Sequence, residues 1–524
     1  MNMALLFALA VGQTTPGAIL IDRGRVDRAR PVQPSAKPAT PRAPTLVTSR
    51  YPGTPIRGIR FVGAKAPAAV AKAARPFIGR AATQTGLAEL AAALSTAYGD
   101  SPVALYTVAI PDQDFAGGVV DVLLTEGRIA TAQVKTDRPG SHPLLRSRMV
   151  PLTQEAPLSR TRFERQVTLM RAIPGLSFDT ALTDPGNDGA LTMVVTPKQK
   201  QRKLTAGFSN RGVDLLGDGQ FDLGAEFYGL ARDGDQVTLA ASAASDLKRY
   251  RYLSGGYALP LPADLTLSAG AAYLETRPKG YPITGRAKQA NLSLAYPLVR
   301  SFHRSADLSL GVDALNSDNA AFGNLIASER TRAVRAAASY ADTRPKRQAA
   351  LSIALSHGLD VAGARTTTAD RGFAKATASA SVAQAIGSRV VARASASGQY
   401  SRSALPAAER FAIGGEAIGR AFDTALLTGD RGAGGLGEIA LRPIGKGKLS
   451  ASELYGFVDG GTVSIEATAL YARQRYTLAS AGVGVRARYG DKAELGLEAA
   501  RAIDDPYAGY DEDWRISVAW RLSM

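Results

Sequence analysis

Cysteine is absent from this chain of 524 residues, and its histidines, His142, His303 and His357, lie far apart. These absences exclude disulfides, thiol catalysis and metal sites built from His and Cys side chains. The Walker A, H-E-x-x-H and G-x-S-x-G motifs are missing as well. The sequence therefore lacks the ligands or the nucleophile that ATPases, H-E-x-x-H zinc proteases and α/β-hydrolases require. We therefore expect no enzyme, no metal and no cofactor.

Long apolar runs are also lacking, because no stretch of 18 apolar residues follows the N-terminal segment. This excludes helical membrane spans, and a membrane role would require a β-barrel. Acidic residues are outnumbered, with 63 Lys and Arg against 46 Asp and Glu and a net charge of +17. Such a charge suits nucleic acid, an anionic membrane surface or an acidic partner, and it does not choose among them.

The N-terminal 51 residues form three segments. Residues 1–17 contain the apolar run ALLFALAV, which has the length of a signal-peptide core, so we interpret them as a signal peptide or its remnant and expect export. Residues 18–30 (AILIDRGRVDRAR) are a short basic amphipathic helix or a disordered basic tail. Residues 31–51 contain five prolines and are typical of an extended linker.

Residues 52–127 and 128–200 each have the pattern of a small α/β domain. In the first, apolar residues at helical spacing follow Thr85, where we expect the helix to begin. In the second, a similar helix ends before Pro174 and a strand of alternating residues follows. The apolar positions of the two helices are Leu87, Leu90, Leu94 and Tyr98, and Phe163, Val167 and Met170.

Residues 201–524 alternate apolar and polar side chains with a period of two, as in Leu308, Leu310 and Val312. Short and long connections alternate, which is typical of an antiparallel transmembrane β-barrel, although an array of soluble β-sandwiches would share the alternation. The pattern predicts 16 strands that start near residues 202, 220, 235, 247, 264, 286, 305, 328, 346, 373, 388, 434, 450, 475, 491 and 512.

The connection at residues 402–433 is the longest and is rich in glycine. Connections of this length are usually functional or disordered. Its end, residues 432–437 (GAGGLG), matches G-x-G-x-x-G, but a strand-like segment follows instead of a helix. No helix N-terminus is therefore present to bind a pyrophosphate, and we reject a dinucleotide site.

Several motifs together resemble the haemolysin-activator type of two-partner secretion outer-membrane transporters. Residues 411–415 (FAIGG), 419–423 (GRAFD) and 429–432 (GDRG) resemble the family's loop 6, although Ala421 replaces the usual glycine. Residues 457–461 (FVDGG) resemble its F-x-D-x-G strand motif, and residues 110–115 and 125–129 resemble the passage between its two POTRA domains. The resemblance begins near residue 18 and reaches the C-terminus.

This resemblance implies a fold and a site. The fold is mixed, with two small α/β POTRA domains, at 52–127 and 128–200, and a 16-stranded barrel at 201–524 whose pore is plugged by a helix at 18–30. The loop-6 lock would comprise Gly414, Gly415, Gly419, Arg420, Phe422, Asp423, Asp430 and Arg431, and its partners on the barrel wall would be Phe457, Asp459 and Gly461. We expect Arg420 to form a two-pronged ion pair with Asp459 inside the barrel.

The implied function is secretion of an unfolded exoprotein, which carries an N-terminal secretion domain, from the periplasm to the cell surface. The expected location is the bacterial outer membrane, with the POTRA domains in the periplasm. We expect a monomer whose barrel is surrounded by outer-membrane lipid and is inserted by the barrel-insertion machinery. We expect no nucleic acid partner. Two alternatives stay open. An insertase of the same superfamily would assemble outer-membrane proteins, and a passive porin or adhesin-like barrel would not need the POTRA pair.

Overall fold

The structure is a computed structural model, which describes residues 25–26, 53–115, 117–137, 140–183, 189–367, 369–467, 472–507, 509–510 and 513–524. The predicted signal peptide, the proline-rich linker and most of the plug helix lie outside these residues, and of the plug helix only Arg25 and Val26 are described. The chain divides into two compact units, one that contains Lys200–Val299 and His303–Met524 and one that contains the small domains before them.

The first small domain contains a sheet of order β1-β3-β2, in which β1 runs parallel to β3. Its helix α4 begins at Gln84, one residue earlier than expected, because the Thr83 hydroxyl caps it by accepting the N–H of Gly86 at 3.1 Å. The predicted apolar stripe of α4 is buried against the sheet. The elements are β1 (Gly58–Gly63), α3 (Ala68–Ala74), η3 (Arg75–Phe77), α4 (Gln84–Gly99), β2 (Tyr106–Ala109) and β3 (Val119–Glu126).

The second small domain repeats the arrangement, with sheet order β4-β6-β5 and β4 parallel to β6. The predicted stripe Phe163, Val167 and Met170 lies buried on α6, as expected from its spacing. Two small α/β domains therefore precede the barrel, as predicted. The elements are β4 (Arg128–Val134), α5 (Pro143–Met149), η4 (Val150–Thr153), α6 (Arg160–Arg171), β5 (Leu176–Thr183) and β6 (Ala190–Gln199).

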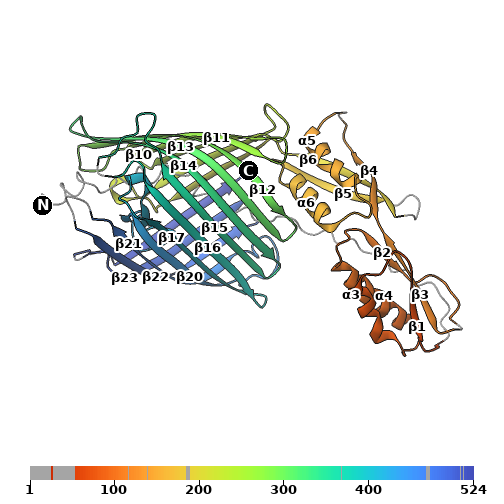
Figure 1. Ribbon diagram of the computed structural model, residues 1–524. Helices are drawn as coiled ribbons and strands as arrows, with labels where there is room; N and C mark the ends of the chain where they lie inside the picture. The colour runs from red at the N-terminus through yellow and green to blue at the C-terminus, as the bar shows by residue number, and fades with distance from the viewer. Residues whose placement is uncertain are drawn as a thin grey trace. The chain divides into compact units, whose positions relative to one another are not determined.

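The remaining chain closes into an antiparallel barrel of 16 strands (Figure 1), which confirms the predicted strand number. Every strand starts within a few residues of its predicted position, because turn residues interrupt the alternation where the strands end. The strands are β7 (Arg202–Ser209), β8 (Gln220–Tyr228), β9 (Gln236–Ala244), β10 (Tyr250–Pro260), β11 (Thr266–Thr276), β12 (Ile283–Arg300), β13 (Arg304–Ala321), β14 (Asn324–Arg344), β15 (Arg347–Gly358), β16 (Ala374–Ile386), β17 (Val390–Ser401), β20 (Arg431–Leu441), β21 (Glu453–Ile465), β22 (Gln474–Tyr489), β23 (Ala493–Asp504) and β24 (Trp514–Ser523).

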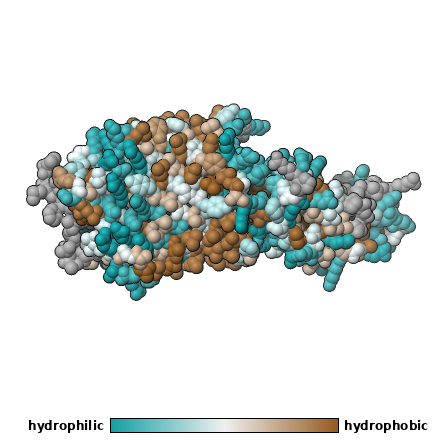
Figure 2. All heavy atoms as spheres, turned by 90° about the horizontal axis from the view of Figure 1, so that it is seen from above, coloured by the Kyte–Doolittle hydropathy of each residue, from teal (hydrophilic) through white to brown (hydrophobic). Residues whose placement is uncertain are grey.

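The barrel wall has an apolar outer face and a polar inner face. Leu310 and Val458 are 56% exposed on the outside, whereas Glu453 and Asp459 are almost completely buried on the inside. Apolar side chains form a band over the barrel, with hydrophilic side chains towards both ends (Figure 2). This is the pattern of a barrel whose outer face meets lipid. Separately, none of the described helices is both long enough and apolar enough to cross a membrane.

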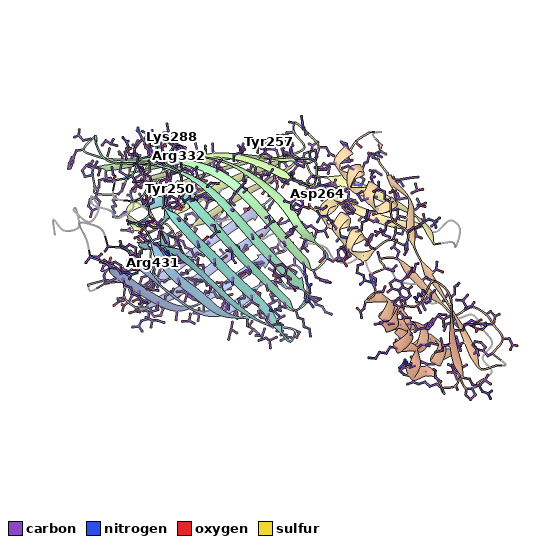
Figure 3. The ribbon with its side chains drawn as sticks, viewed as in Figure 1. Tyr250, Tyr257, Asp264, Lys288, Arg332 and Arg431 are labelled. Atoms are coloured by element: carbon purple, nitrogen blue, oxygen red, sulfur yellow. The ribbon has the colours of Figure 1, made fainter. Side chains whose placement is uncertain are left out.

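The two ends of the barrel differ in their connections. The end that we name the long-loop end carries residues 359–373 and 402–430, and the short-turn end carries residues 261–265, 387–389 and 490–492. Figure 3 shows Asp264 of a short turn and Arg431 of the long-loop end on opposite sides of the barrel. One exception at the short-turn end is the longer connection at 442–452.

The barrel closes where its last strand meets its first. The ladder between β24 and β7 covers Ala519–Ser523 and Thr205–Ser209, and main-chain hydrogen bonds extend it to Met524 with Leu204 and to Val518 with Asn210. By comparison, β13 pairs with β14 over its whole length. The closing seam is therefore much shorter than the ladder between β13 and β14.

We predict that Ile353→Arg and Ser352→Arg differ sharply, because the two neighbouring residues of β15 face opposite sides of the wall. Ile353 is 48% exposed on the outer face. An arginine there costs about 2–4 kcal/mol near the bilayer centre and less near its edges. Unfolding of the barrel from lipid vesicles measures this difference, with Ser352→Arg as the matched lumen control. Equal losses of stability in the two variants would contradict the assigned faces.

Candidate functional site

Residues 402–430, which we name the long loop, fold into the barrel instead of extending from it. The loop contains the turn η6 (Ala407–Glu409) and a small hairpin of β18 (Phe411–Ile413) and β19 (Leu427–Gly429). Its apolar residues form one buried cluster with side chains of the barrel wall. The loop contributes Ile413, Ile418, Ala421, Phe422 and Leu427, and the wall contributes Tyr455, Phe457, Val463 and Leu478.

Glycine provides both the bends of the long loop and the space beside it. Gly414, Gly415 and Gly419 adopt φ values of +104°, +98° and +83°, which side chains other than glycine rarely accept. On the wall, a Cβ atom at Gly434 would come within 2.7 Å of Ile418, and one at Gly461 within 3.0 Å of the same side chain. The absence of side chains at Gly434 of β20 and Gly461 of β21 therefore leaves room for the Ile418 side chain of the loop.

Asp459 of β21 holds the tip of the long loop through main-chain hydrogen bonds. Its carboxylate accepts the N–H of Gly419 at 2.9 Å, the N–H of Arg420 at 3.2 Å and the Ser480 hydroxyl at 2.5 Å. All three donors are buried with it, so the carboxylate satisfies groups that have no access to water. Its role resembles that of a side chain that caps a turn.

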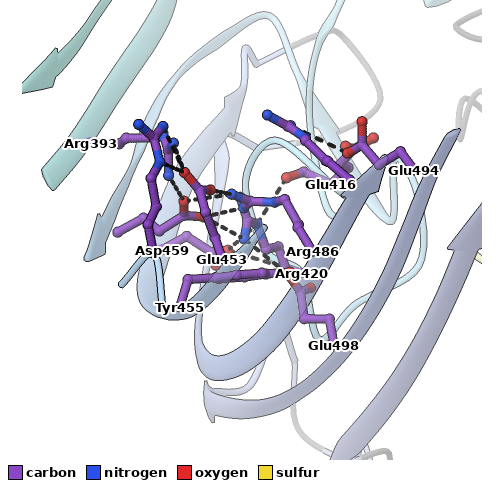
Figure 4. Close-up of polar contacts among 12 residues, drawn as sticks. Arg393, Glu416, Arg420, Glu453, Tyr455, Asp459, Arg486, Glu494 and Glu498 are labelled. Carbon is purple, nitrogen blue, oxygen red and sulfur yellow. Dashed lines mark hydrogen bonds and ion pairs between the residues drawn. The ribbon is translucent and has the colours of Figure 1, made fainter. Parts of the chain in front are cut away.

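The Arg420 guanidinium points at other carboxylates. Nη1 lies 3.0 Å from Glu498 and 3.4 Å from Glu438, and Nε donates to the carbonyl oxygen of Glu416 at 3.1 Å (Figure 4). The guanidinium carbon also lies 4.5 Å from the centre of the Phe457 ring, a cation–π contact. Nε approaches Asp459 only to 3.9 Å. The expected two-pronged pair between Arg420 and Asp459 is therefore wrong, although the two residues do meet.

Further arginines from the wall complete this network. Arg486 contacts Glu438 at 2.5 Å and Glu453 at 3.0 Å, and Arg393 contacts the same two carboxylates at 2.8 and 2.7 Å. Each buried carboxylate thus has at least two cationic or hydroxyl partners (Figure 4), as Glu498 does with Arg211 and Tyr455. If the loop moved away, some of these buried charges would lose their partners, which is energetically unfavourable. The network therefore holds the loop in one position.

The other predicted loop residues fix its two flanks. Asp423 pairs with Arg515 of β24 at 2.5 Å. The completely buried Asp430 accepts the N–H groups of Leu405 and Glu466 at 2.7 and 2.8 Å. Arg431 pairs with Glu466 at 2.8 Å and lies over the ring of Tyr400. The structure therefore places all eleven predicted site residues in or beside the long loop, with Phe422 in its apolar cluster.

A second buried cluster, which the motifs did not reveal, lies around Glu409 of the same loop. Its carboxylate pairs with Arg335 of β14 and Lys375 of β16, both at 2.8 Å, and with Arg25 of the N-terminal segment at 2.5 Å. Arg335 also pairs with Asp313 of β13. The only sequence signal is the lumen-side position of Arg335 and Lys375 on alternating strands.

The charge of Glu409 depends on these partners. Burial alone would raise the pKa of this carboxyl, but the positive charges of Arg25, Arg335 and Lys375 hold its pKa well below the usual range. Glu409 therefore stays ionised at neutral pH. In the described part of the chain, no group of His, Cys, Asp and Glu side chains is arranged to hold a metal ion.

We predict that Asp459→Ala releases the long loop while the barrel stays folded. The change leaves two buried N–H donors without an acceptor, at a cost of about 1–3 kcal/mol each. Limited trypsin digestion of the purified protein then cuts after Arg410 or Arg420, which are almost completely buried in the wild type. Exchanging the charges at 420 and 459 does not restore protection, because an arginine at 459 accepts no hydrogen bond.

Glu226→Ala is the matched control. Glu226 is a barrel carboxylate whose partners Lys203, Tyr228 and Gln236 all lie on β7–β9. Its removal leaves the digestion pattern unchanged. Resistance of Asp459→Ala at the wild-type level would show that Asp459 does not hold the loop.

The chain was compared with known families and structures. Residues 191–487 match the model described as haemolysin secretion/activation protein ShlB/FhaC/HecB, and residues 54–127 match the POTRA domain of ShlB type. No curated protein sequence matches.

Solved structures share the fold. CdiB from Escherichia coli is 17% identical, with a TM-score of 0.66 over 94% of each chain. CdiB from Acinetobacter baumannii is 18% identical, with a TM-score of 0.60 over 95% of this chain and 94% of that one. BamA from Haemophilus ducreyi lacking POTRA domains 1-3 is 14% identical, with a TM-score of 0.58 over 90% of this chain and 99% of that one.

The resemblance to two-partner secretion transporters is thus confirmed, and these findings indicate the bacterial outer membrane. Because the family model covers more than half of the sequence, the chain belongs to the ShlB/FhaC/HecB family of haemolysin secretion/activation proteins.

Proposed function

We propose that the protein captures an unfolded exoprotein in the periplasm and passes it through the barrel to the cell surface, without catalysis or a cofactor. The observation that carries this proposal is the long loop, which is held inside the lumen by the Asp459 and Arg420 networks in a chain of this family. The loop and its charged surroundings occupy the space through which a substrate would pass. In this proposal the substrate displaces the loop as one body, so that the loop is the moving part of the pore.

The small domains supply a physical means of capture. Each has a three-stranded sheet whose central strand is β3 or β6, so the outer strands each have one edge unpaired within the sheet. Most of β5 is exposed, including Leu182. The exoprotein carries an N-terminal secretion domain, and an extended segment of it can add to such an edge by main-chain hydrogen bonds. In this proposal the small domains lie in the periplasm.

The N-terminal segment is proposed to plug the resting barrel. Arg25, which is 3% exposed, donates to the carbonyl oxygen of Ala408 at 3.0 Å and pairs with Glu409. Val26 lies next to Gly311 of β13, where an added Cβ atom would be 2.8 Å from it. Two described residues of the proposed plug, 18–30, thus contact both the loop and the wall. Residues 31–51 would tether it.

We predict that the protein exports a partner encoded beside its gene. In cells that produce both proteins, the exoprotein appears at the surface or in the medium, and Asp459→Ala lowers export at least tenfold without lowering the amount of inserted barrel. Glu226→Ala serves again as the control. If deletion of the gene instead depletes other outer-membrane barrels while the exoprotein still leaves the cell, the chain is an assembly insertase and the transport proposal is wrong.

We predict that removing residues 18–30 raises ion conductance in planar bilayers, since the pore loses its plug. Arg25→Ala produces a smaller rise, because Glu409 keeps Arg335 and Lys375 and only the plug loses its ion pair. Arg347→Gln, an exposed change at the short-turn end, leaves the conductance unchanged. Wild-type conductance after the deletion would refute the plug.

A further inference from the structure

The outer wall at the long-loop end carries a row of charged side chains across three neighbouring strands. Arg251 of β10 is directly opposite Glu275 of β11, which is directly opposite Arg286 of β12. Their neighbours Tyr250, Leu274 and Ala287 are buried on the lumen side, so this row faces outwards. One row closer to the barrel centre, Tyr273 of β11 is opposite Leu253 and Lys288.

These rows have more positive than negative charge. Glu275 is shared between Arg277 at 2.8 Å and Arg286 at 3.8 Å, so one carboxylate serves several cations. Lys288 adds another cation in the next row (Figure 3). On β14, two strands beyond β12, Arg332 donates to the carbonyl oxygens of Leu315 and Thr331 and to the Asn316 side chain, which are all neutral.

An apolar depression of about 1020 Å³ adjoins this basic cluster on the same outer face. Small residues form part of its surface, since Gly255 is opposite Ala271 in the row that follows Tyr273. Leucines from β8, β9 and β10 surround it, and Lys288 lies at its border. The leucines are Leu223, Leu239 and Leu253, which are at least half exposed.

We propose that this surface binds a diphosphorylated glycolipid of the outer leaflet, with acyl chains in the depression and phosphates on Arg251, Arg286, Lys288 and Arg332. Cations on the lipid-facing side of a barrel cost little near the membrane interfaces, and at the long-loop end they can reach the phosphates of lipid headgroups. Guanidinium groups bind phosphate through paired hydrogen bonds.

The spacing favours two phosphates over one. Arg251 and Arg286 are two strands apart, which is about 10 Å at the usual strand spacing, and Arg332 lies a further two strands away on β14. A lipid with a single phosphate can contact only part of this cluster. The proposal rests on the proposed function in one respect: with the small domains in the periplasm, we place the long-loop end at the cell surface. It does not require transport.

Native mass spectrometry of the full-length protein in detergent, with diphosphorylated lipid A as the probe, tests the proposal. The triple variant Arg286→Gln, Lys288→Gln, Arg332→Gln removes three cations and lowers lipid A affinity at least about tenfold, equivalent to about 1.4 kcal/mol. The control triple Lys346→Gln, Arg347→Gln, Arg389→Gln removes the same charge from exposed residues near the short-turn end and keeps wild-type affinity.

Equal affinity of the two triple variants for lipid A would overturn the proposal. It would also fall if phosphatidylglycerol, with one phosphate, competed as well as lipid A. Folding is checked by the heat-dependent gel mobility of the barrel, and if the triple variant does not fold, Lys288→Gln alone is measured and still lowers the affinity. Because export is not measured, a negative result leaves the transport proposal intact.

Discussion

Carboxylates buried inside the barrel need donors or cations, and much of the interior is arranged to provide them. Asp459, Glu438, Glu453, Glu498 and Glu409 are all almost completely buried. Wall arginines satisfy some of their oxygens, but the main-chain N–H groups of the long loop and the side chain of Arg420 satisfy others. Removing the loop would leave buried charges incompletely paired, which is unfavourable in a shielded space. The folded-in loop and the charged wall therefore depend on each other.

The two carboxylate clusters give the loop two different attachments. Asp459 and its neighbours hold the tip against β20–β23, whereas Glu409 joins the base of the loop to β14, β16 and the N-terminal Arg25. A displaced N-terminal segment would leave Glu409 with Arg335 and Lys375, so its carboxylate would remain paired. The loop can thus lose one partner without exposing an unpaired charge.

The sequence predicts the barrel well because strand alternation is a local property. The outward residues Leu308, Leu310 and Val312, and the inward Asp459, follow from a period of two once one face is apolar. Motif resemblance likewise locates the loop. The partners of Arg420 and the whole Glu409 cluster could not be predicted, because they depend on which distant strands face each other across the lumen. Residues as far apart as Arg25 and Glu409 meet only after the barrel has closed.

The short seam between β24 and β7 has a consequence for how the chain folds. The two strands lie at opposite ends of the barrel sequence, so they can pair only after every intervening strand has been made and ordered. Until then both present unpaired edges, which readily pair with other chains. The ladder that closes the barrel is also short, with Ala519–Ser523 and Thr205–Ser209 in register. During assembly of this protein, the edges of β7 and β24 must therefore be kept from pairing with other chains until the barrel closes.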